Sequence, residues 1–393
     1  MKHWKVGIIK DTSKPDLGLH GLHTAFLGLP GVEIAALADS NPRMCEDIMK
    51  FTQAERRYYD PAEMIEREKP DIVIITSRRP SDHLPQIRMA ERGCHIYCEK
   101  PVSASLEEAD EIVRIIEKSG VKLCMAHPGR YGTPYRAMKE AVERGEIGTP
   151  LRVSTYGKCD HRGGGEDLMT LGTHLLDLMI FFFGDPVGVR AELYTGGAPA
   201  LKSERTKTVE EIGPCAGEEL FAEFRFANGV RGTFESCRGL FHYDGGMQTN
   251  MGLSVTGTKG ILSERFTDGL PDDPVRICRT PYPAEYGVPF ELFPVQETRT
   301  VPGAVPMDDF VRTVPGIPHT QFFIGANHFA AWDLIRAIEE DRLPVSNIYN
   351  ARKTLEMIYG IYASHLKAGA RVEFPLRNRK HPLESEPGEE SSR

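Results

Sequence analysis

A lysine and a glutamate stand side by side where a short apolar run ends. Glu99, Lys100 and Pro101 directly follow Cys98, the last residue of a predicted strand. Side chains at the carboxyl end of a parallel strand emerge at the sheet edge where ligands bind. A lysine held there, next to a carboxylate, is suited to donating a proton or polarising a carbonyl. We therefore predict that Lys100 is catalytic; the structural alternative is a surface ion pair ahead of a helix.

A second set of reactive side chains lies within the apolar segment 166–183. Asp167, Thr170, His174 and Asp177 recur there every three or four residues, so at about 100° per residue they share an arc of roughly 80° on a helix. Two carboxylates and an imidazole on a buried helix are costly unless they have partners. We expect the stripe to line a wet cleft, with His174 catalytic; the structural alternative is an interior histidine oriented by Asp177.

The residues just before this helix add further candidates. Lys158, Asp160, His161 and Arg162 are suited to contacts with sugar hydroxyls, and the glycines 163–165 can let the backbone approach a ligand closely. No metal site is expected. The alternative is a site in which Asp160, His161 and His174 supply oxygen and nitrogen ligands.

Positioning these groups requires a regular framework, and the first 125 residues predict one. Short β-branched runs at 5–9, 32–38, 71–76, 94–98 and 121–125 alternate with segments of helical spacing. This alternation predicts right-handed crossovers and a doubly wound parallel sheet. We place a first domain at residues 1–126.

The pattern changes after Pro134. Strand-like and helical segments then predict a mostly antiparallel sheet with helices on one face, in a domain spanning 127–376. The stretch 266–318 is rich in proline and glycine and is expected to form a substrate lid or an oligomer contact. The polar residues 377–393 are expected to be a disordered tail.

The loop after the first strand lacks the glycine fingerprint of dinucleotide sites, because only Gly18 and Gly21 are present between Lys10 and Gly21. Lys10 or Lys14 can still pair with phosphate; the alternative is a solvated loop without nucleotide. The second strand ends at Asp39, where an acid binds the adenosine ribose and favours NAD over NADP. Asp39 or Ser40 can also cap a helix, and Arg43 leaves NADP open.

Composition excludes several classes of protein. The 393 residues include 48 basic and 56 acidic side chains, a net charge of −8, which argues against nucleic acid or an anionic membrane as the main partner. The most apolar segment, 168–183, contains His174 and Asp177 and is too short for a bilayer core of about 30 Å. The start has no signal-peptide pattern, and the eight cysteines form no CxxC pair. A cytoplasmic protein of more than one domain is expected.

Taken together, the motifs resemble the Gfo/Idh/MocA family of oxidoreductases over about residues 4–376. The resemblance rests on the order and spacing of VGII, PGVEIAALADSNP, EREKPDIVIIT, GCHIYCEKP, RYGTPYRAMKEAVERGEIGTP, GGGEDLMTLGTHLLDLM, VTGTKGIL and YASHLKAGARVEFPL. It implies an N-terminal Rossmann domain and a C-terminal α/β domain whose large open sheet forms homodimers or homotetramers. The implied chemistry moves hydride between NAD or NADP and a carbon of a sugar, polyol or related small molecule.

The resemblance also implies roles for single residues. Lys100 matches the lysine that binds the reacting oxygen or relays its proton, and His174 matches the acid–base histidine. Thr170 stands where many family members have an aspartate, so Asp167, one turn earlier, is a substitute base. We expect cofactor contacts from polar residues at or beyond the strand ends: Lys10, Asp11, Thr12, Asp39, Ser40, Arg43, Thr76, Ser77, His83, Glu99, Lys100 and His127.

Three functions remain open at this point. The first is an NAD(P)-dependent dehydrogenase in which Lys100 and His174 face one crevice. The second is a keto-sugar lyase or hydrolase with tightly held NAD or a metal and no net redox change. The third is a non-catalytic relative that has lost its nucleotide, suggested by the altered loop 10–17.

Overall fold

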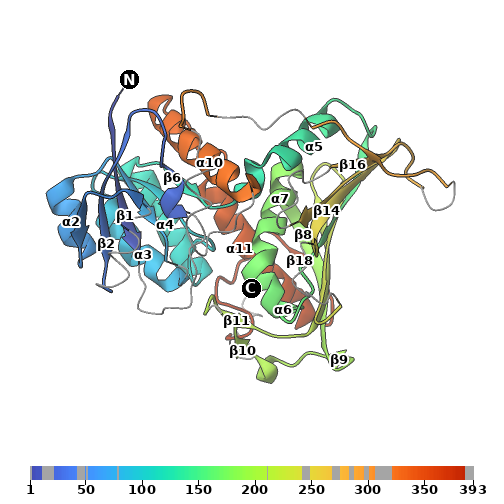
Figure 1. The fold of residues 1–393 in the computed structure, drawn as a ribbon. Helices are drawn as coiled ribbons and strands as arrows, with labels where there is room; N and C mark the ends of the chain where they lie inside the picture. Colours follow the sequence, from blue (N-terminus) through green and yellow to red (C-terminus); the bar gives the residue numbers. More distant parts are fainter. Residues whose placement is uncertain are drawn as a thin grey trace. The chain divides into compact units, whose positions relative to one another are not determined.

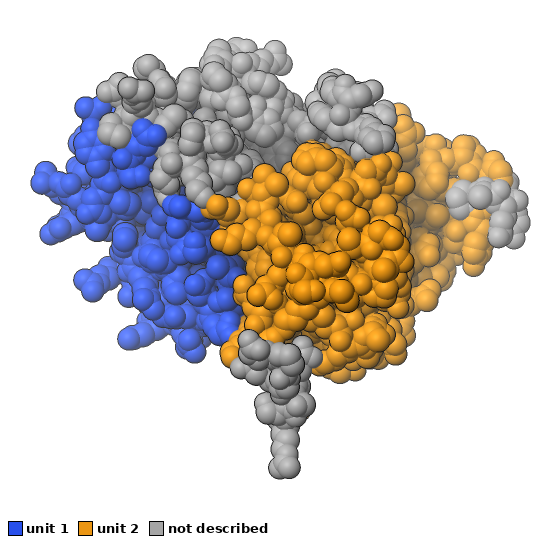
Figure 2. Space-filling model, turned by 90° about the horizontal axis from the view of Figure 1, so that it is seen from below, with its two compact units in different colours: residues 1–131, 298–352 blue, residues 132–297, 353–393 orange. Residues whose placement is uncertain are grey.

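The computed structural model describes residues 2–10, 22–41, 49, 52–77, 79–209, 211–240, 248–267, 275–282, 287–295, 301–305 and 321–385. The chain folds into two compact units. Unit 1 comprises residues 1–131 and 298–352, and unit 2 comprises residues 132–297 and 353–393 (Figure 2). No helix in the described ranges is long and apolar enough to cross a membrane.

Unit 1 contains a six-stranded parallel sheet (Figure 1). Its order is β3(Arg56–Tyr58), β2(Val32–Asp39), β1(Trp4–Lys10), β4(Ile72–Ile75), β5(His95–Cys98) and β6(Leu123–Met125). The five predicted strands are confirmed. The edge strand β3 was not predicted, because its sequence RRY has no apolar alternation and faces solvent. The order reverses direction between β1 and β4, as in dinucleotide-binding sheets.

The helices of unit 1 follow local sequence signals. They are α2(Pro61–Glu68), α3(His83–Ala90) and α4(Leu106–Ser119), with short 3-10 turns η1(Leu22–Thr24), η2(Pro80–Asp82) and η3(Pro128–Arg130). Helix α4 shows the logic, since the Ser105 side chain accepts from the Glu108 N–H and Gly120 ends the helix at φ 73°. The doubly wound arrangement predicted for this part of the chain is confirmed.

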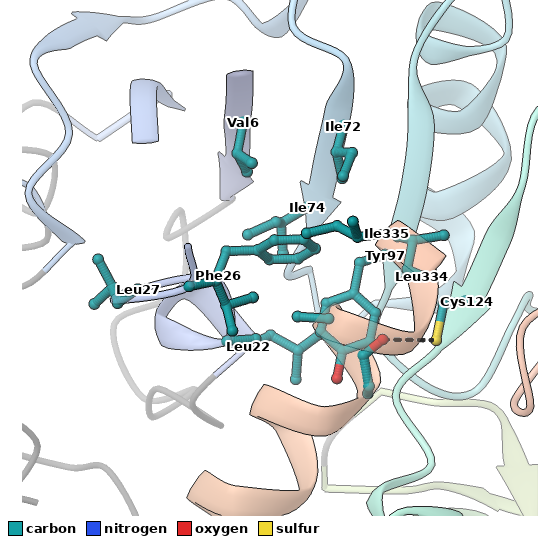
Figure 3. Packing of buried hydrophobic residues seen from close by; sticks show 14 of the residues in the cluster. Val6, Leu22, Phe26, Leu27, Ile72, Ile74, Tyr97, Cys124, Leu334 and Ile335 are labelled. Carbon is teal, nitrogen blue, oxygen red and sulfur yellow. Dashed lines mark hydrogen bonds between the residues drawn. The ribbon is translucent and has the colours of Figure 1, made fainter. Parts of the chain in front are cut away.

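A late segment of the chain completes unit 1. Helix α10(Gln321–Glu339) contributes Leu334 and Ile335 to the same buried cluster as Phe26 and Tyr97 (Figure 3). The Tyr97 hydroxyl donates to Asn327 Oδ1 at 2.9 Å. The sequence assigns this helix to the 127–376 domain, because its helical spacing does not say which sheet its apolar face covers.

A polar network also ties this segment to the end of β6. The Tyr131 hydroxyl donates to Asp333 at 2.9 Å and accepts from the Ser346 N–H at 3.0 Å, and it lies 3.5 Å from Cys124 Sγ, the contact dashed in Figure 3. Arg342 donates to the other oxygen of Asp333 at 2.7 Å. These bonds hold residues 333–346 in unit 1.

Unit 2 is built on a ten-stranded, mostly antiparallel sheet, as predicted. Its order is β17(Glu291–Leu292), β16(Arg276–Cys278), β15(Ile261–Thr267), β14(Gln248–Gly257), β7(Pro150–Tyr156), β13(Arg231–Cys237), β12(Glu219–Phe226), β8(Pro186–Thr195) and β18(Val372–Glu373), with β9(Ala198–Pro199) on β8. Only β7 and β13 pair in parallel. The strands β10(Thr206–Lys207) and β11(Pro214–Cys215) form a separate ribbon.

Helices cover one face of this sheet. Figure 1 shows α5(Thr133–Glu143) and α7(Thr173–Phe183) on the same side, and α11(Ile348–His365) packs on β8, where the Ala191 N–H donates to Ser364 Oγ at 2.9 Å. Strand β12 alternates accordingly, with Leu220, Ala222, Phe224 and Phe226 buried. The short turn η5(Lys202–Glu204) precedes β10.

Part of the predicted disordered tail is ordered. His381 and Leu383 are buried, and the His381 ring lies 4.5 Å from the ring of Tyr359 and 5.3 Å from that of Tyr362. Burial of these side chains offsets the entropy lost by ordering the chain. The expectation of disorder is therefore wrong for residues 377–385, and residues 386–393 lie outside the described ranges.

The stretch 266–318 is described only in pieces. β16 and β17 extend the edge of the large sheet, and the Val305 N–H donates to Gly28 O at 2.9 Å within unit 1. The expected lid or oligomer role of this stretch stays a prediction.

Candidate functional site

The polar residues predicted for cofactor binding stand at the carboxyl edge of the unit 1 sheet. Lys10 and Asp39 are in register at the ends of β1 and β2. The first residues beyond the next strands continue the ladder: the Thr76 N–H donates to Ile9 O at 3.0 Å, and the Glu99 N–H donates to Ile75 O at 2.9 Å. These backbone hydrogen bonds continue the pairing of the strands, so the loops that follow the strands all begin at the same edge of the sheet.

These polar side chains are buried, which is unusual for charged groups. Asp39 is fully buried, and Lys10, Glu99 and Lys100 are 6%, 2% and 5% exposed. Two carboxylates are fixed by backbone donors, since Asp39 Oδ1 accepts from the Asn41 N–H at 2.9 Å and Glu99 Oε1 accepts from the Lys100 N–H at 3.0 Å. Buried charges gathered beyond strand ends indicate a built ligand site.

This edge fits a nicotinamide dinucleotide. The crevice of such sheets lies beyond the carboxyl ends, at the reversal between β1 and β4. A carboxylate at the end of β2 offers acceptors to ribose hydroxyls, and the ammonium groups of Lys10 and Lys100 offer charge to anionic groups. Ser40 is exposed beside Asp39. The predicted contacts Asp11, Thr12 and Arg43 lie outside the described residues.

Two predicted histidines are buried behind this edge. His127 follows β6 and is 2% exposed. His83 is fully buried, with Nε2 2.7 Å from Ser77 O and Nδ1 3.2 Å from Val102 O. The Ser77 hydroxyl donates to Asp82 at 2.6 Å. The His83 ring therefore contacts the loops that carry Thr76 and Lys100.

In unit 2, Asp167 is an anchor between the helix and the sheet. Its Oδ2 accepts from the Ser236 hydroxyl at 2.6 Å and from the Cys159 N–H at 3.2 Å, while Oδ1 has no hydrogen-bond partner among the described residues. Burial raises the pKa of this carboxyl, against the lowering effect of the Ser236 and Cys159 bonds. The substitute base predicted at this position thus faces the interior of unit 2.

The predicted helix 166–183 is interrupted near its start. It consists of α6(Gly165–Asp167), the π-helical segment η4(Leu168–Gly172) and α7. A π segment has more residues per turn than an α-helix, so it changes the direction of Asp167 relative to His174. The arc calculated for a regular helix therefore does not hold across η4. Thr170 is buried, and its hydroxyl donates to Glu166 O at 2.9 Å.

Beyond the π segment, the remaining stripe residues lie on α7. His174 is half-buried and Asp177 is 1% exposed. They are three residues apart, a spacing that places them on one side of a helix. The prediction that His174 is catalytic stays a prediction.

Asp160 and Arg162 form an ion pair in the loop before the helix. Arg162 donates to both carboxylate oxygens of Asp160, at 3.2 and 2.9 Å, and Lys158 Nζ lies 3.9 Å away. Burial works against ionisation, but the Arg162 bonds dominate in sum and lower the pKa of Asp160. The His161 side chain is 80% exposed. In the part of the chain that the structure describes, no three His, Cys, Asp or Glu residues are close enough to hold a metal, so the alternative ligand set is not brought together.

The glycines 163–165 allow close packing against the sheet. A Cβ on Gly163 would lie 2.1 Å from Arg238 N, and one on Gly165 would lie 2.0 Å from Ala216 O. These glycines are therefore required for packing on the side where a Cβ would project, and the prediction that they let a ligand approach closely stays a prediction.

The partners of Asp167 were not predicted from the sequence. Ser236 continues the inward-facing row of β13 after Gly232 and Phe234, and a polar residue in such a row was the available signal. For Cys159, nothing in the sequence indicated that its N–H would bind this carboxylate. Its positive φ of 58° turns its N–H toward the carboxylate.

Family models match both the N-terminal and the C-terminal part of the chain. Residues 19–127 match the model of an oxidoreductase family with an NAD-binding Rossmann fold, and residues 135–263 match the C-terminal domain model of the same family. Myo-inositol 2-dehydrogenase of Thermotoga maritima is 26% identical over 60% of this chain and 67% of its own length. D-apiose dehydrogenase of Paraburkholderia graminis is 32% identical over 41% of this chain and 46% of its own length. The matches thus span about half to two thirds of these relatives.

The fold is shared over almost the whole chain. The crystal structure of scyllo-inositol dehydrogenase from Lactobacillus casei, with bound NAD(H) and scyllo-inositol, covers 95% of this chain and 99% of that protein, with a TM-score of 0.64 and 17% identity. This likeness supports the two-part architecture.

Proposed function

Because the chain belongs to the Gfo/Idh/MocA family of oxidoreductases, we propose that it transfers hydride between NAD(P) and a hydroxyl or keto carbon of a sugar, polyol or related small molecule. The relatives named above act on inositol and apiose. The observation that supports this proposal most is the set of buried charges, Asp39, Glu99 and Lys100, at the carboxyl edge of the parallel sheet.

Lys100 and His174 share the proton transfer in this proposal. The ammonium group of Lys100 binds the reacting oxygen and stabilises its negative charge, and the His174 imidazole accepts the hydroxyl proton. A nicotinamide ring supplies the hydride acceptor when bound. Glu99 accepts from the Lys100 N–H and so fixes the backbone that carries the ammonium group.

NAD is the expected cofactor. The buried carboxylate of Asp39 offers acceptors to ribose hydroxyls but repels a 2′-phosphate. Isothermal titration of the purified chain with NAD⁺, NADH, NADP⁺ and NADPH tests this. Tighter binding of the NAD pair supports the proposal, and binding of none of the four in the millimolar range rejects it.

A substrate panel tests the reaction. Inositols, aldoses and glycosides are incubated with NAD⁺, and NADH formation is followed by absorbance. Product formed without net NADH would instead favour the lyase or hydrolase type of chemistry. Replacing Lys100 by alanine should lower turnover by about 10²–10⁴-fold, whereas Lys118→Ala, at the exposed end of α4, is a matched control that should have no effect. Near-normal turnover in Lys100→Ala would reject the assignment.

We further propose a homo-oligomer that forms through the open face of the unit 2 sheet. Arg225, Arg231 and Arg152 lie directly opposite one another on β12, β13 and β7 and face solvent. None of the three has an ion pair within the described ranges. Like charges directly opposite one another are destabilising. An acidic surface on a partner would neutralise the charge of this arginine row.

The same face supplies that acidic surface at its other end. Exposed Glu192, Glu219 and Glu235 form a glutamate group around Phe221, which is 52% exposed. A two-fold axis through the centre of the face would lay the arginine row of one copy over the glutamate group of a second.

Charge reversal tests this arrangement. Light scattering after size exclusion should show that Arg225→Glu/Arg231→Glu is monomeric, as is Glu219→Arg/Glu235→Arg. Mixing the two variants should restore an oligomer, because each then offers the charge that the other lacks. Arg67→Glu on α2 is the control, since Arg67 is 68% exposed in unit 1. Unchanged assembly of both double variants would refute the proposed interface.

We also propose a cytoplasmic location, supported by the seven described cysteines, all of which are free thiols. Fractionation of the native host tests it.

A further inference from the structure

His83 contacts two backbone carbonyls and nothing in solvent. It is the first residue of α3 and is fully buried. Its Nε2 lies 2.7 Å from Ser77 O, and its Nδ1 lies 3.2 Å from Val102 O. Both distances are within hydrogen-bond range.

The ring can donate to either carbonyl. A carbonyl oxygen only accepts, so a ring nitrogen that carries a hydrogen can bond with it. Whichever nitrogen carries the hydrogen, the other lies close to the second carbonyl, so the ring is held between the two.

The two carbonyls belong to the two loops that carry the proposed site. Ser77 follows Thr76 at the end of β4, and Val102 lies two residues beyond Lys100. β4 and β5 are adjacent, with Ile75 in register with Cys98. His83 therefore bridges the loop after β4 and the loop after β5, which carries Lys100.

A second set of bonds stiffens one side of this bridge. The Asp82 carboxylate accepts from the Ser77 hydroxyl at 2.6 Å and from Arg79 Nε at 3.0 Å. The β4 loop is thus tied both to His83 and to the residue before it. On the other side, the His83 ring connects the Val102 loop to α3, with Nδ1 3.2 Å from Val102 O.

We propose that His83 is a positioning residue, a brace whose ring sets the spacing of the Ser77 and Lys100–Val102 loops and so presets Lys100 for its reaction. This inference rests on the proposed function for its catalytic consequence. The brace itself belongs to the ligand-free protein.

Two variants separate the brace from ring packing. His83→Phe keeps a ring of similar size and removes both ring nitrogens. His83→Gln keeps a donor group, its NH₂, but loses the rigid ring that spans the two carbonyls. His3→Gln is the control, because the His3 side chain is 65% exposed. Since a displacement of about 1 Å can cost about 10²-fold in rate, His83→Phe should lower kcat by about that factor with little change in the sugar KM.

Hydrogen exchange of the ligand-free protein, together with kcat, decides the proposal. Exchange in His83→Phe should accelerate in peptides covering 76–82 and 99–105 but not in β6, with His83→Gln intermediate. Unchanged exchange in a folded His83→Phe variant would overturn the brace.

Failure of the proposed function is distinguishable from failure of the brace. If the wild type neither binds nucleotide nor oxidises any substrate, the dehydrogenase proposal fails while the exchange data still support or reject the brace. If the wild type is active and His83→Phe keeps its kcat, the positioning role is refuted. If His83→Phe does not fold, the exchange pattern and kcat of His83→Gln support or reject the brace in its place.

Discussion

Replacing Asp167 separates an anchoring carboxyl from a catalytic base. The chain offers two informative changes. Asp167→Ala removes both carboxylate oxygens, and Asp167→Asn keeps one carbonyl oxygen where Oδ2 accepts its two bonds. If Asp167 acts through structure alone, the alanine variant should be clearly less stable than the asparagine variant.

The magnitude follows from the bonds of Asp167. In Asp167→Ala, the Ser236 hydroxyl, now 2.6 Å from Oδ2, and the Cys159 N–H, now 3.2 Å from it, lose their acceptor inside the protein. An orphaned buried donor costs about 1–3 kcal/mol, so losing the acceptor of these two donors should lower the free energy of unfolding by about 2–6 kcal/mol. Asp167→Asn leaves one amide N–H₂ without a partner and should cost about 1–2 kcal/mol.

The pH dependence has a definite sign. Burial raises the pKa of Asp167 above its value in the unfolded chain, with the Ser236 and Cys159 bonds opposing this. Folding therefore favours the protonated carboxyl, and this contribution to stability is complete at low pH and is lost as the pH rises through the raised pKa. Asparagine does not titrate, so the wild type should lose stability relative to Asp167→Asn as the pH rises above about 4.

Denaturant unfolding followed by circular dichroism, together with steady-state kinetics, checks these expectations. The reasoning would be refuted if Asp167→Ala kept the unfolding free energy of the wild type. It would also be refuted if Asp167→Asn, while stable, lost turnover as severely as Lys100→Ala. That pattern would identify Asp167 as the base.

Other predictions concern stability. Glu68→Gln should lower the free energy of unfolding by about 2 kcal/mol. The Arg56 hydrogen bond lowers the pKa of Glu68 to about 2, so the wild type should be more stable than the variant above about pH 4.5 and should lose this advantage toward pH 2. Acid unfolding of both proteins measures the difference. Burial lowers the pKa of His381 to about 3, so the free energy of unfolding should decrease as the pH falls from about 6.5 to about 3. In His381→Phe, the melting temperature should depend less on pH over that range. Gly157→Ala places a Cβ 2.1 Å from a carboxylate oxygen and should cost about 1–3 kcal/mol in urea unfolding; Gly325→Ala meets nothing within 4 Å and should not destabilise.

The edge of the first sheet could be predicted from local sequence. A run of β-branched residues predicts a strand, and the residue that ends the run then stands at the sheet edge whatever else the chain does. Asp39, Glu99 and Lys100 were identified in this way, and the strand ends lie where expected. The sequence predicted the doubly wound arrangement, but it predicted neither the order of the strands nor the edge strand β3.

The second unit shows where local periodicity stops being sufficient. Asp167 was expected in a cleft because a regular helix was assumed, but η4 changes the turn, and the hydroxyl that binds the carboxylate comes from Ser236, far along the chain. The glycines before the helix were likewise ambiguous, since a missing side chain suits a ligand and a neighbouring strand equally.

What the sequence determined by itself is the kind of each element and the residues that end the strands, because both depend on neighbours a few positions away. Only the tertiary structure decided which sheet α10 covers, what His83 bridges and which way Asp167 points. Those outcomes depend on hydrogen-bond partners and apolar surfaces from distant segments. The hydrophobic pattern of a helix or strand shows which of its faces is buried, but not which other element packs against that face.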